Sequence, residues 1–81
     1  MREWIDEIAE AFGEEVLLFT DFDDALIGIS TDYVAVYSER RIIELLVAEG
    51  MSEEDAWDHY GFNMLGSHVG QKTPIIVKEP E

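Results

Sequence analysis

The sequence predicts an α+β fold in which helices pack on one face of a small antiparallel or mixed sheet. Apolar residues recur at helical spacing in three segments, and short runs between them are rich in β-branched and aromatic residues. Along the chain these segments follow the order α-β-β-α-α-β. Because the chain has 81 residues, it has room for a single domain, 1–81, built around one hydrophobic core.

The first element is an amphipathic helix predicted over residues 2–12. Its apolar residues share one face and its acidic residues share the opposite face. Gly13 is placed to end this helix, because glycine adopts the left-handed backbone conformation without strain. The apolar residues expected on the buried face are Trp4, Ile5, Ile8, Ala11 and Phe12.

The middle of the chain predicts a β-hairpin. Residues 25–30 and 33–38 form its strands, and Thr31 and Asp32 form its turn. The preceding apolar run, residues 16–20, fits either a strand or a buried connection, since periodicity does not decide between them. The side chains expected to share one face of the second strand are Tyr33, Ala35 and Tyr37.

Two further helices and a strand are predicted in the second half of the chain. Ser38 is placed to cap a helix over residues 39–49, and Ser52 is placed to cap a third helix. The third helix is expected to fade between Ser67 and Gly70. A final strand is expected over residues 73–77, so that the sheet gains a third member.

The predicted third helix and the residues that follow it contain glycines and histidines. Glycine inside a helix costs roughly 1 kcal/mol relative to alanine, so Gly61 and Gly66 are expected to let a neighbouring element approach closely. His59 and Asn63 lie one helical turn apart on one face, and His68 lies off that face. A zinc site usually needs three or four protein ligands, so two histidines with optional carboxylates are weak support for one, and helical or capping histidines are the expected interpretation.

Charge is the most distinctive property of the sequence. The 19 Asp and Glu residues outnumber the 5 Lys and Arg residues, which gives a net charge of −14 and a pI near 4.1. Such a chain is repelled by nucleic acid and by anionic membranes, so neither is expected as a direct partner. It is attracted to a protein with a basic surface, above all one that normally binds nucleic acid. The alternative is that the acidity serves only solubility or salt tolerance.

The acidic residues concentrate in two segments. Along the first helix they recur at steps of three and four residues, which places them ~5–6 Å apart on one face. Phosphates along a DNA strand are separated by a similar order of distance, so this face could mimic nucleic acid. A second patch at the start of the third helix would extend the first if the two helices lay side by side. The residues expected to bind the partner are Glu3, Asp6, Glu7, Glu10, Glu14, Glu53, Glu54, Asp55 and Asp58.

No catalytic residues are predicted. Asp21 and Asp23 have the spacing of the nucleophile loop of haloacid-dehalogenase-type phosphatases, but Ala25 replaces the usual threonine and the chain is too short for that fold. An EF-hand is excluded because Leu26 occupies the position that needs glycine. No cysteine is present to form a disulfide or a thiolate metal site, and no cofactor is expected.

Two alternatives to the partner-binding hypothesis remain. The chain could be a small ligand- or divalent-metal-binding module that uses Asp21, Asp23, Asp24 and Asn63. It could also be a structural homodimer that buries Trp4, Tyr33 or Trp57. The acidic N-terminus does not read as a signal peptide, and no apolar run is long enough to cross a membrane, so a cytoplasmic location is expected.

Part of the sequence resembles a group of small acidic proteins encoded by bacteriophages and bacteria. The resemblance spans residues 22–75, about two-thirds of the chain. It implies a phage-type accessory protein, located in the host cytoplasm, and it carries no activity or catalytic residues. By analogy with acidic phage proteins that block host defence, it suggests an inhibitor of the anti-CRISPR or DNA-mimic type. The residues that carry it are Phe22-Asp23-Asp24-Ala25-Leu26-Ile27-Gly28-Ile29, Val36-Tyr37-Ser38, Gly50-Met51-Ser52-Glu53-Glu54-Asp55-Ala56, Phe62-Asn63, Gly66, Val69-Gly70 and Thr73-Pro74-Ile75.

Overall fold

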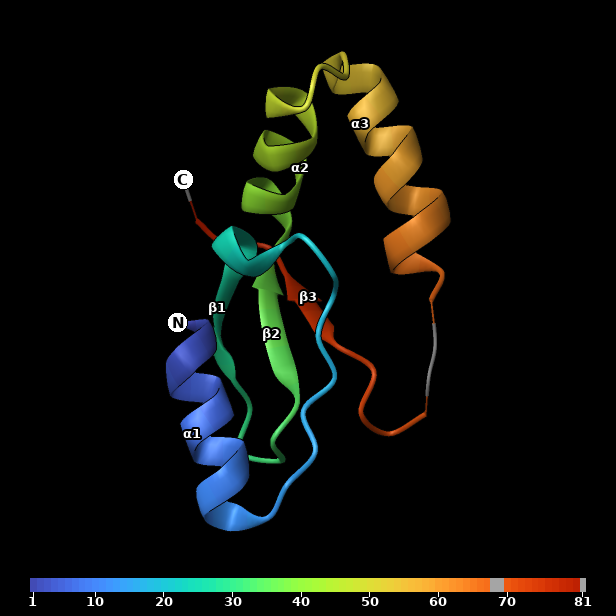
Figure 1. The fold of residues 1–81 in the computed structure, drawn as a ribbon. Helices are drawn as coiled ribbons and strands as arrows, with labels where there is room; N and C mark the ends of the chain where they lie inside the picture. The colour runs from blue at the N-terminus through green and yellow to red at the C-terminus, as the bar shows by residue number, and fades with distance from the viewer. Residues whose placement is uncertain (68–69, 81) are drawn as a thin grey trace.

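A computed structural model describes residues 1–67 and 70–80. The predicted α+β class and the order α-β-β-α-α-β are confirmed (Figure 1). A single 3₁₀ turn, η1, precedes the first strand, and a π-helical turn, η2, extends the third helix. The elements are α1 (Arg2–Phe12), η1 (Asp23–Ala25), β1 (Leu26–Ile29), β2 (Ala35–Ser38), α2 (Glu39–Ala48), α3 (Glu53–Tyr60), η2 (Gly61–Leu65) and β3 (Ile75–Val77).

The sheet has β2 at its centre. β2 pairs antiparallel with β1 and parallel with β3, so the sheet is mixed. The parallel pairing requires a long crossover between β2 and β3, and the α2–α3 helical hairpin supplies it. A register shift between Leu26 and Gly28 makes β1 irregular.

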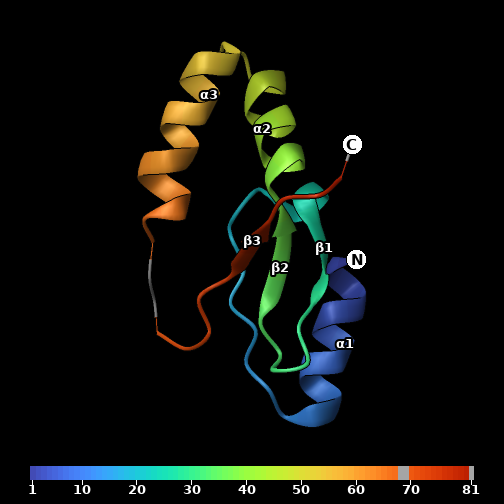
Figure 2. The same cartoon turned by 180° about the vertical axis from the view of Figure 1, so that it is seen from behind.

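The helices pack against the sheet as the sequence predicts, but the expected buried face of α1 is partly wrong: Ile5 is buried, whereas Trp4 and Phe12 are 47% and 61% exposed. α1 runs beside β1, and the connection that follows it crosses the side of the sheet that faces the viewer in Figure 1. The same segments lie behind the sheet in Figure 2. α2 continues directly from the end of β2, and α3 folds back along α2, so this hairpin extends past one end of the sheet. None of the described helices is both long enough and apolar enough to cross a membrane.

The core lies where the apolar faces of these elements meet. Ile5 of α1, Tyr37 of β2, Ile42 of α2 and Tyr60 of α3 are all at most 1% exposed. Ala35 and Tyr37 are buried on the same face of β2, as strand alternation predicts. Apolar side chains of the connection 14–22 pack against this cluster from the side.

The structure decides one open alternative and corrects the predicted hairpin. Residues 16–20 form a partly buried connection and not a strand, and the Phe19 N–H donates to the Tyr37 hydroxyl at 2.9 Å. The hairpin turn is longer than Thr31-Asp32: it extends to Tyr33, whose φ is 62°, and the Ser30 N–H donates to the Val34 carbonyl at 2.8 Å. Tyr33 is therefore outside the strand.

The predicted helix caps are confirmed. The Ser38 hydroxyl accepts from the Arg41 N–H at 3.3 Å, and the Ser52 hydroxyl accepts from the Asp55 N–H at 3.1 Å. Gly13 ends α1 with a φ of 64°. The final strand is shorter than predicted and starts at Ile75.

The expected role of the glycines in the third helix is wrong. A Cβ atom on Gly61 would meet no described atom within 4 Å, and one on Gly66 would meet only carbonyl oxygens of its own helix. These glycines instead mark the π-helical turn, which starts at Gly61 and is followed by Gly66. The helix was expected to fade between residues 67 and 70, and this segment lies partly outside the described residues. His68 and Val69 lie wholly outside them.

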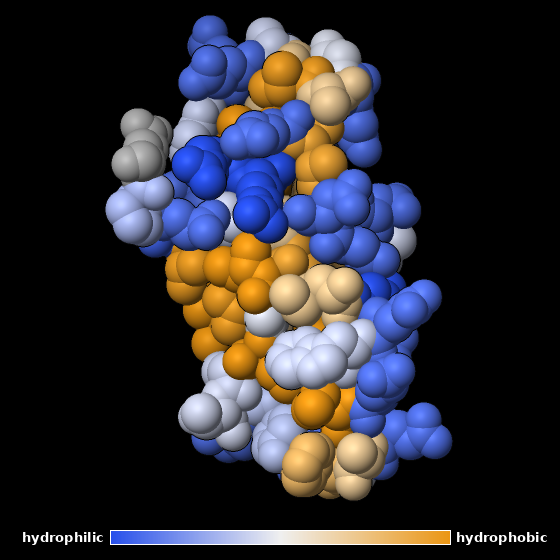
Figure 3. All heavy atoms as spheres, turned by 90° about the vertical axis from the view of Figure 1, so that its left-hand side faces the viewer, coloured by the Kyte–Doolittle hydropathy of each residue, from blue (hydrophilic) through white to orange (hydrophobic). Residues whose placement is uncertain are grey.

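The sheet carries apolar residues on both faces. Val36 and Ile75 pair with each other and, by alternation, point away from the face that holds Tyr37. Ile75 is 41% exposed. From the side on which α1 and β1 lie, hydrophobic residues gather in the middle of the molecule, with hydrophilic residues above and beside them (Figure 3).

Candidate partner-binding surface

The acidic stripe of α1, formed by Glu3, Asp6, Glu7 and Glu10, faces solvent. Ile5 is fully buried and turns its side of the helix towards the core. The four acidic residues lie on the other side and are all exposed. Asp6 forms an ion pair with Arg2, with 3.6 Å between Oδ1 and Nε. The other three carboxylates have no cationic partner among the described residues.

Glu14, which the sequence placed at the end of this stripe, has a structural role. Its side chain forms an ion pair with Lys72, with 3.3 Å between Oε2 and Nζ. Lys72 also donates to the carbonyl oxygen of Asp32 at 3.1 Å and lies 5.9 Å from the ring centre of Tyr33. The pair therefore ties the end of α1 to the hairpin turn and to the segment before β3.

The second acidic patch lies at the start of α3. Glu53, Glu54 and Asp55 occupy the first helical turn, where the helix dipole stabilises negative charge, and Asp58 follows one turn later. All four are exposed. Figures 1 and 2 show α1 and α3 at opposite ends of the molecule, whose longest extent is 40 Å. The two patches are therefore separate surfaces and do not extend one another, because α1 packs on β1 whereas α3 packs on α2.

The aspartates of the alternative ligand site line a shallow hollow of about 400 Å³. Asp23 is already paired with Arg2, whose Nη1 lies 3.3 Å from both carboxylate oxygens. Asn63 does not line this hollow, and its amide instead donates to the carbonyl of His59 at 3.0 Å. Within residues 1–67 and 70–80, no three or more His, Asp or Glu side chains are grouped to hold a metal ion. The residues that line the hollow are Arg2, Leu18, Phe19, Thr20, Asp21, Asp23 and Asp24.

The aromatic residues of the homodimer hypothesis are not brought together. Trp4 is 47% exposed on α1, and Trp57 is 42% exposed on α3, at the other end of the molecule. Tyr33 is half-buried and packs on Phe12, with 5.7 Å between the ring centres. The homodimer hypothesis needs only one of these residues at an interface, so it stays a prediction.

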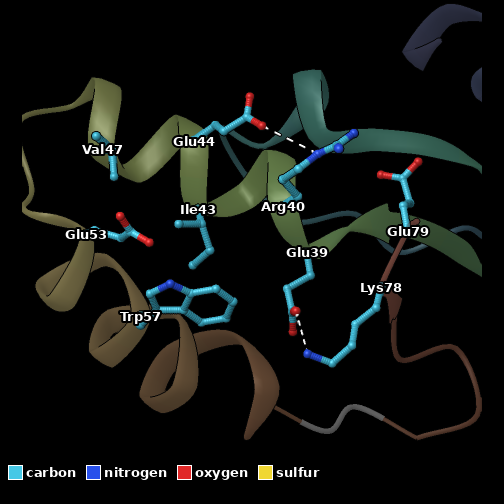
Figure 4. A pocket seen from close by; sticks show the side chains of 9 residues that line it. All are labelled: Glu39, Arg40, Ile43, Glu44, Val47, Glu53, Trp57, Lys78 and Glu79. Atoms are coloured by element: carbon cyan, nitrogen blue, oxygen red, sulfur yellow. Dashed lines mark hydrogen bonds and ion pairs between the residues drawn. The ribbon is translucent and has the colours of Figure 1, made fainter. Parts of the chain in front are cut away.

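A larger groove, which the sequence did not indicate, opens between α2, α3 and the segment after β3 (Figure 4). Its volume is about 680 Å³. Ile43, Val47 and Trp57 form its apolar surface, and carboxylates from all three segments surround them. We call it the α2–α3 groove, and it is lined by Glu39, Arg40, Ile43, Glu44, Val47, Glu53, Trp57, Lys78 and Glu79.

Glu39 is the structural centre of this groove. It accepts a hydrogen bond from the Tyr60 hydroxyl at 2.7 Å and another from Lys78 Nζ at 2.8 Å. Its side chain is only 14% exposed. The hydrogen bond from Lys78 holds the pKa of Glu39 below its usual value, so the carboxylate is ionised at neutral pH. Burial and the hydrogen bond to Glu39 raise the pKa of Tyr60, which keeps its hydroxyl protonated.

The sequence carries one signal of the groove. Ala56, Tyr60 and Met64 are four residues apart and are all buried, so they form the core-facing stripe of the third helix. Trp57 is offset by one residue from that stripe and therefore points to a different side. The Glu39 contacts carry no such signal, because Tyr60 and Lys78 lie 21 and 39 residues away along the chain.

Comparison with protein families, with curated proteins and with solved structures gives no match for this chain. The resemblance to phage and bacterial proteins therefore stays a prediction.

Proposed function

We propose that this chain is a non-enzymatic binding protein whose acidic α1 stripe docks on a positively charged surface of another protein. The observation that carries the proposal is the state of Glu3, Glu7 and Glu10: all three are exposed and lack a cationic partner in the described part of the chain. A stripe of unneutralised carboxylates is complementary to a surface rich in Lys and Arg.

Glu3 lies in the first turn of α1, where the helix dipole favours it, but the fold gives Glu7 and Glu10 no role of their own. Like charges three or four residues apart destabilise a helix by about 0.2–0.5 kcal/mol per pair. No basic residue stands in the last turn of α1, where a cation would be favourable. A pattern that costs stability and makes no contact within the described chain is typical of a surface kept for a partner.

The most specific form of the proposal concerns a partner that handles nucleic acid. The carboxylate spacing on α1 is of a similar order to that of phosphates, so the stripe would compete with DNA or RNA for the same basic residues. The resemblance to phage-type proteins supports an inhibitor of a host nucleic-acid-handling or defence complex, of the anti-CRISPR type, acting in the host cytoplasm.

Charge reversal on α1 tests the proposal. Partners would be captured from nuclease-treated bacterial extract, and the affinity of each purified partner would be measured by calorimetry. The variant E3K/E7K/E10K is expected to weaken binding by about 100-fold or more, because each reversal replaces an attraction by a repulsion. Raising the salt concentration should weaken the wild-type complex as well.

The matched control is E49K/E54K/D58K, which reverses three exposed carboxylates at the far end of the molecule. The net charge changes by the same amount in both variants, so a difference between them locates the interface. Equal affinities for the wild type and the α1 variant would overturn the proposal.

A further inference from the structure

The α2–α3 groove combines an apolar surface with an excess of negative charge. Ile43 is buried at its base, while Val47 and Trp57 are each 42% exposed. Figure 4 shows the Trp57 ring close below Ile43, with Glu53 beside it and Glu79 at the opposite end of the groove. Exposed indole and valine side chains of this kind are suited to contact with another chain.

The two cations of the groove are already neutralised within the chain. Arg40 pairs with Glu44, with 3.6 Å between Nε and Oε1, and Lys78 pairs with Glu39 at 2.8 Å. Glu53 and Glu79 have no cationic partner among the described residues. The uncompensated charge of the groove therefore belongs to these two carboxylates.

Glu79 provides an independent sign of a missing donor. Its Oε1 atom is buried and has no hydrogen-bond partner, and no other side-chain polar atom of the described residues is in this state. A buried oxygen without a donor is unfavourable, and more so if it is charged. If the Glu79 side chain turns towards the groove, a cationic donor from outside the chain reaches this oxygen and removes that penalty.

We propose that the α2–α3 groove binds a basic segment of a partner protein, in which arginine or lysine side chains alternate with apolar ones. One cation lies over the face of Trp57 and pairs with Glu53, while a second reaches Glu79. The long aliphatic stems of these side chains cover Val47 and Ile43, since Arg and Lys bury their stems while the charged head stays polar.

Charge complementarity selects this occupant over a second copy of the chain. The net charge of −14 makes two copies repel each other, and the described Lys and Arg residues other than Arg41 are already in ion pairs. The inference rests on the proposed function, because it supplies a second contact for the same class of partner. It uses different residues from the α1 stripe, so the two can fail separately.

The test uses the full chain and a capped peptide in which arginine alternates with leucine, followed by ¹H–¹⁵N spectra. The Nε1–H resonance of Trp57 should shift in a saturable way, whereas that of Trp4 on α1 should move little. A peptide with citrulline in place of arginine keeps the shape without the charge, and it should bind about tenfold more weakly.

Two groove variants and one matched control locate the site. W57L and, separately, E53Q/E79Q are each expected to weaken binding of the peptide by about tenfold. W57L also removes the edge contact between the Trp57 and Tyr60 rings, whose centres are 5.7 Å apart, so E53Q/E79Q is the variant that leaves the surroundings of Tyr60 unchanged. E3Q/E7Q, which removes the same charge from α1, should change the affinity by less than about twofold if the contact is local. Thermal unfolding of each variant checks that it is folded.

Two results would overturn the inference. One is a peptide that does not bind, or that binds without moving the Trp57 resonance. The other is equal weakening by E53Q/E79Q and E3Q/E7Q, which would mean diffuse attraction to the whole acidic chain. Neither result bears on the proposed function, which depends on the α1 variant and its natural partner. Conversely, a partner lost on E3K/E7K/E10K but unaffected by W57L would sustain the proposed function without the groove.

Discussion

α1 and α3 are both acidic helices, of 11 and 8 residues, yet their carboxylates stand in different electrostatic settings. α3 begins with a Ser52 cap and carries its acids in the first turn, where the helix dipole favours them, and His59 lies in its last turn. α1 has no side-chain cap, extends its acids to Glu10 near its end, and has no basic residue in its last turn. The charges of Glu53, Glu54 and Asp55 are therefore favoured by helix stability, whereas those of Glu7 and Glu10 are not.

The two helices also differ in what holds them to the rest of the molecule. α1 buries Ile5 against the sheet and is linked through Arg2 to Asp23 and through Glu14 to Lys72. α3 is anchored by Tyr60, which is buried and donates to Glu39 at the start of α2. The contrast teaches that acidity alone does not identify a binding surface: the informative carboxylates are those that stabilise nothing within the fold.

The largest expected effect on stability comes from the anchor of α3. Tyr60→Phe removes a hydrogen bond to an ionised carboxylate and should lower the free energy of unfolding by about 1.5–3 kcal/mol. Chemical denaturation measures this loss. Amide hydrogen exchange should show faster opening in α3 than in α1, because only α3 loses its anchor. Equally faster hydrogen exchange in both helices would contradict a separate anchor for α3.

The pH dependence of the same contacts sharpens the comparison. The folded-state pKa of Glu39 is lowered from its usual value of 4.5, so its contribution to stability is present above about pH 4.5 and is lost as the pH falls through the folded pKa. The difference in unfolding free energy between the wild type and E39Q should therefore shrink on acidification. Urea titrations at several pH values between neutral and acidic measure it. A difference that stays constant would show that Lys78 does not stabilise the ionised form.

The smallest expected effect is opposite in sign for the two helices. Glu10→Lys places a cation in the last turn of α1 and should stabilise the protein by about 0.3–1 kcal/mol. Glu54→Lys places a cation in the first turn of α3 and should destabilise it by a similar amount. Thermal unfolding at low ionic strength detects both shifts. If the two substitutions changed stability in the same direction, helix electrostatics would not explain where the acids lie.

The elements of the fold were predictable because their signals are local. The apolar spacing of residues 2–12, the caps at Ser38 and Ser52, and the stop at Gly13 each involve contacts within a few residues. The left-handed conformation of Tyr33 was not predictable, since an aromatic residue is typical of a strand and rarely adopts a positive φ.

The arrangement of the candidate site was less predictable, because it depends on distant contacts. The parallel pairing of β3 with β2 brings Lys78 next to Glu39, and nothing in either local segment indicates it. The separation of α1 from α3 has the same origin. The exposure and charge of the α1 stripe followed from its periodicity, but the neutralisation of Glu14 and Asp23 by Lys72 and Arg2 required the folded chain.

Competition with nucleic acid tests the central proposal most directly. A captured partner would be loaded with a fluorescent nucleic acid and titrated with the wild-type chain, with E3K/E7K/E10K and with E49K/E54K/D58K. Wild type and the second variant should release the nucleic acid at similar concentrations, while the α1 variant should need about 100-fold more. Equal release by all three proteins, or a stable ternary complex with the nucleic acid still bound, would contradict a role for α1 as a substitute for phosphates.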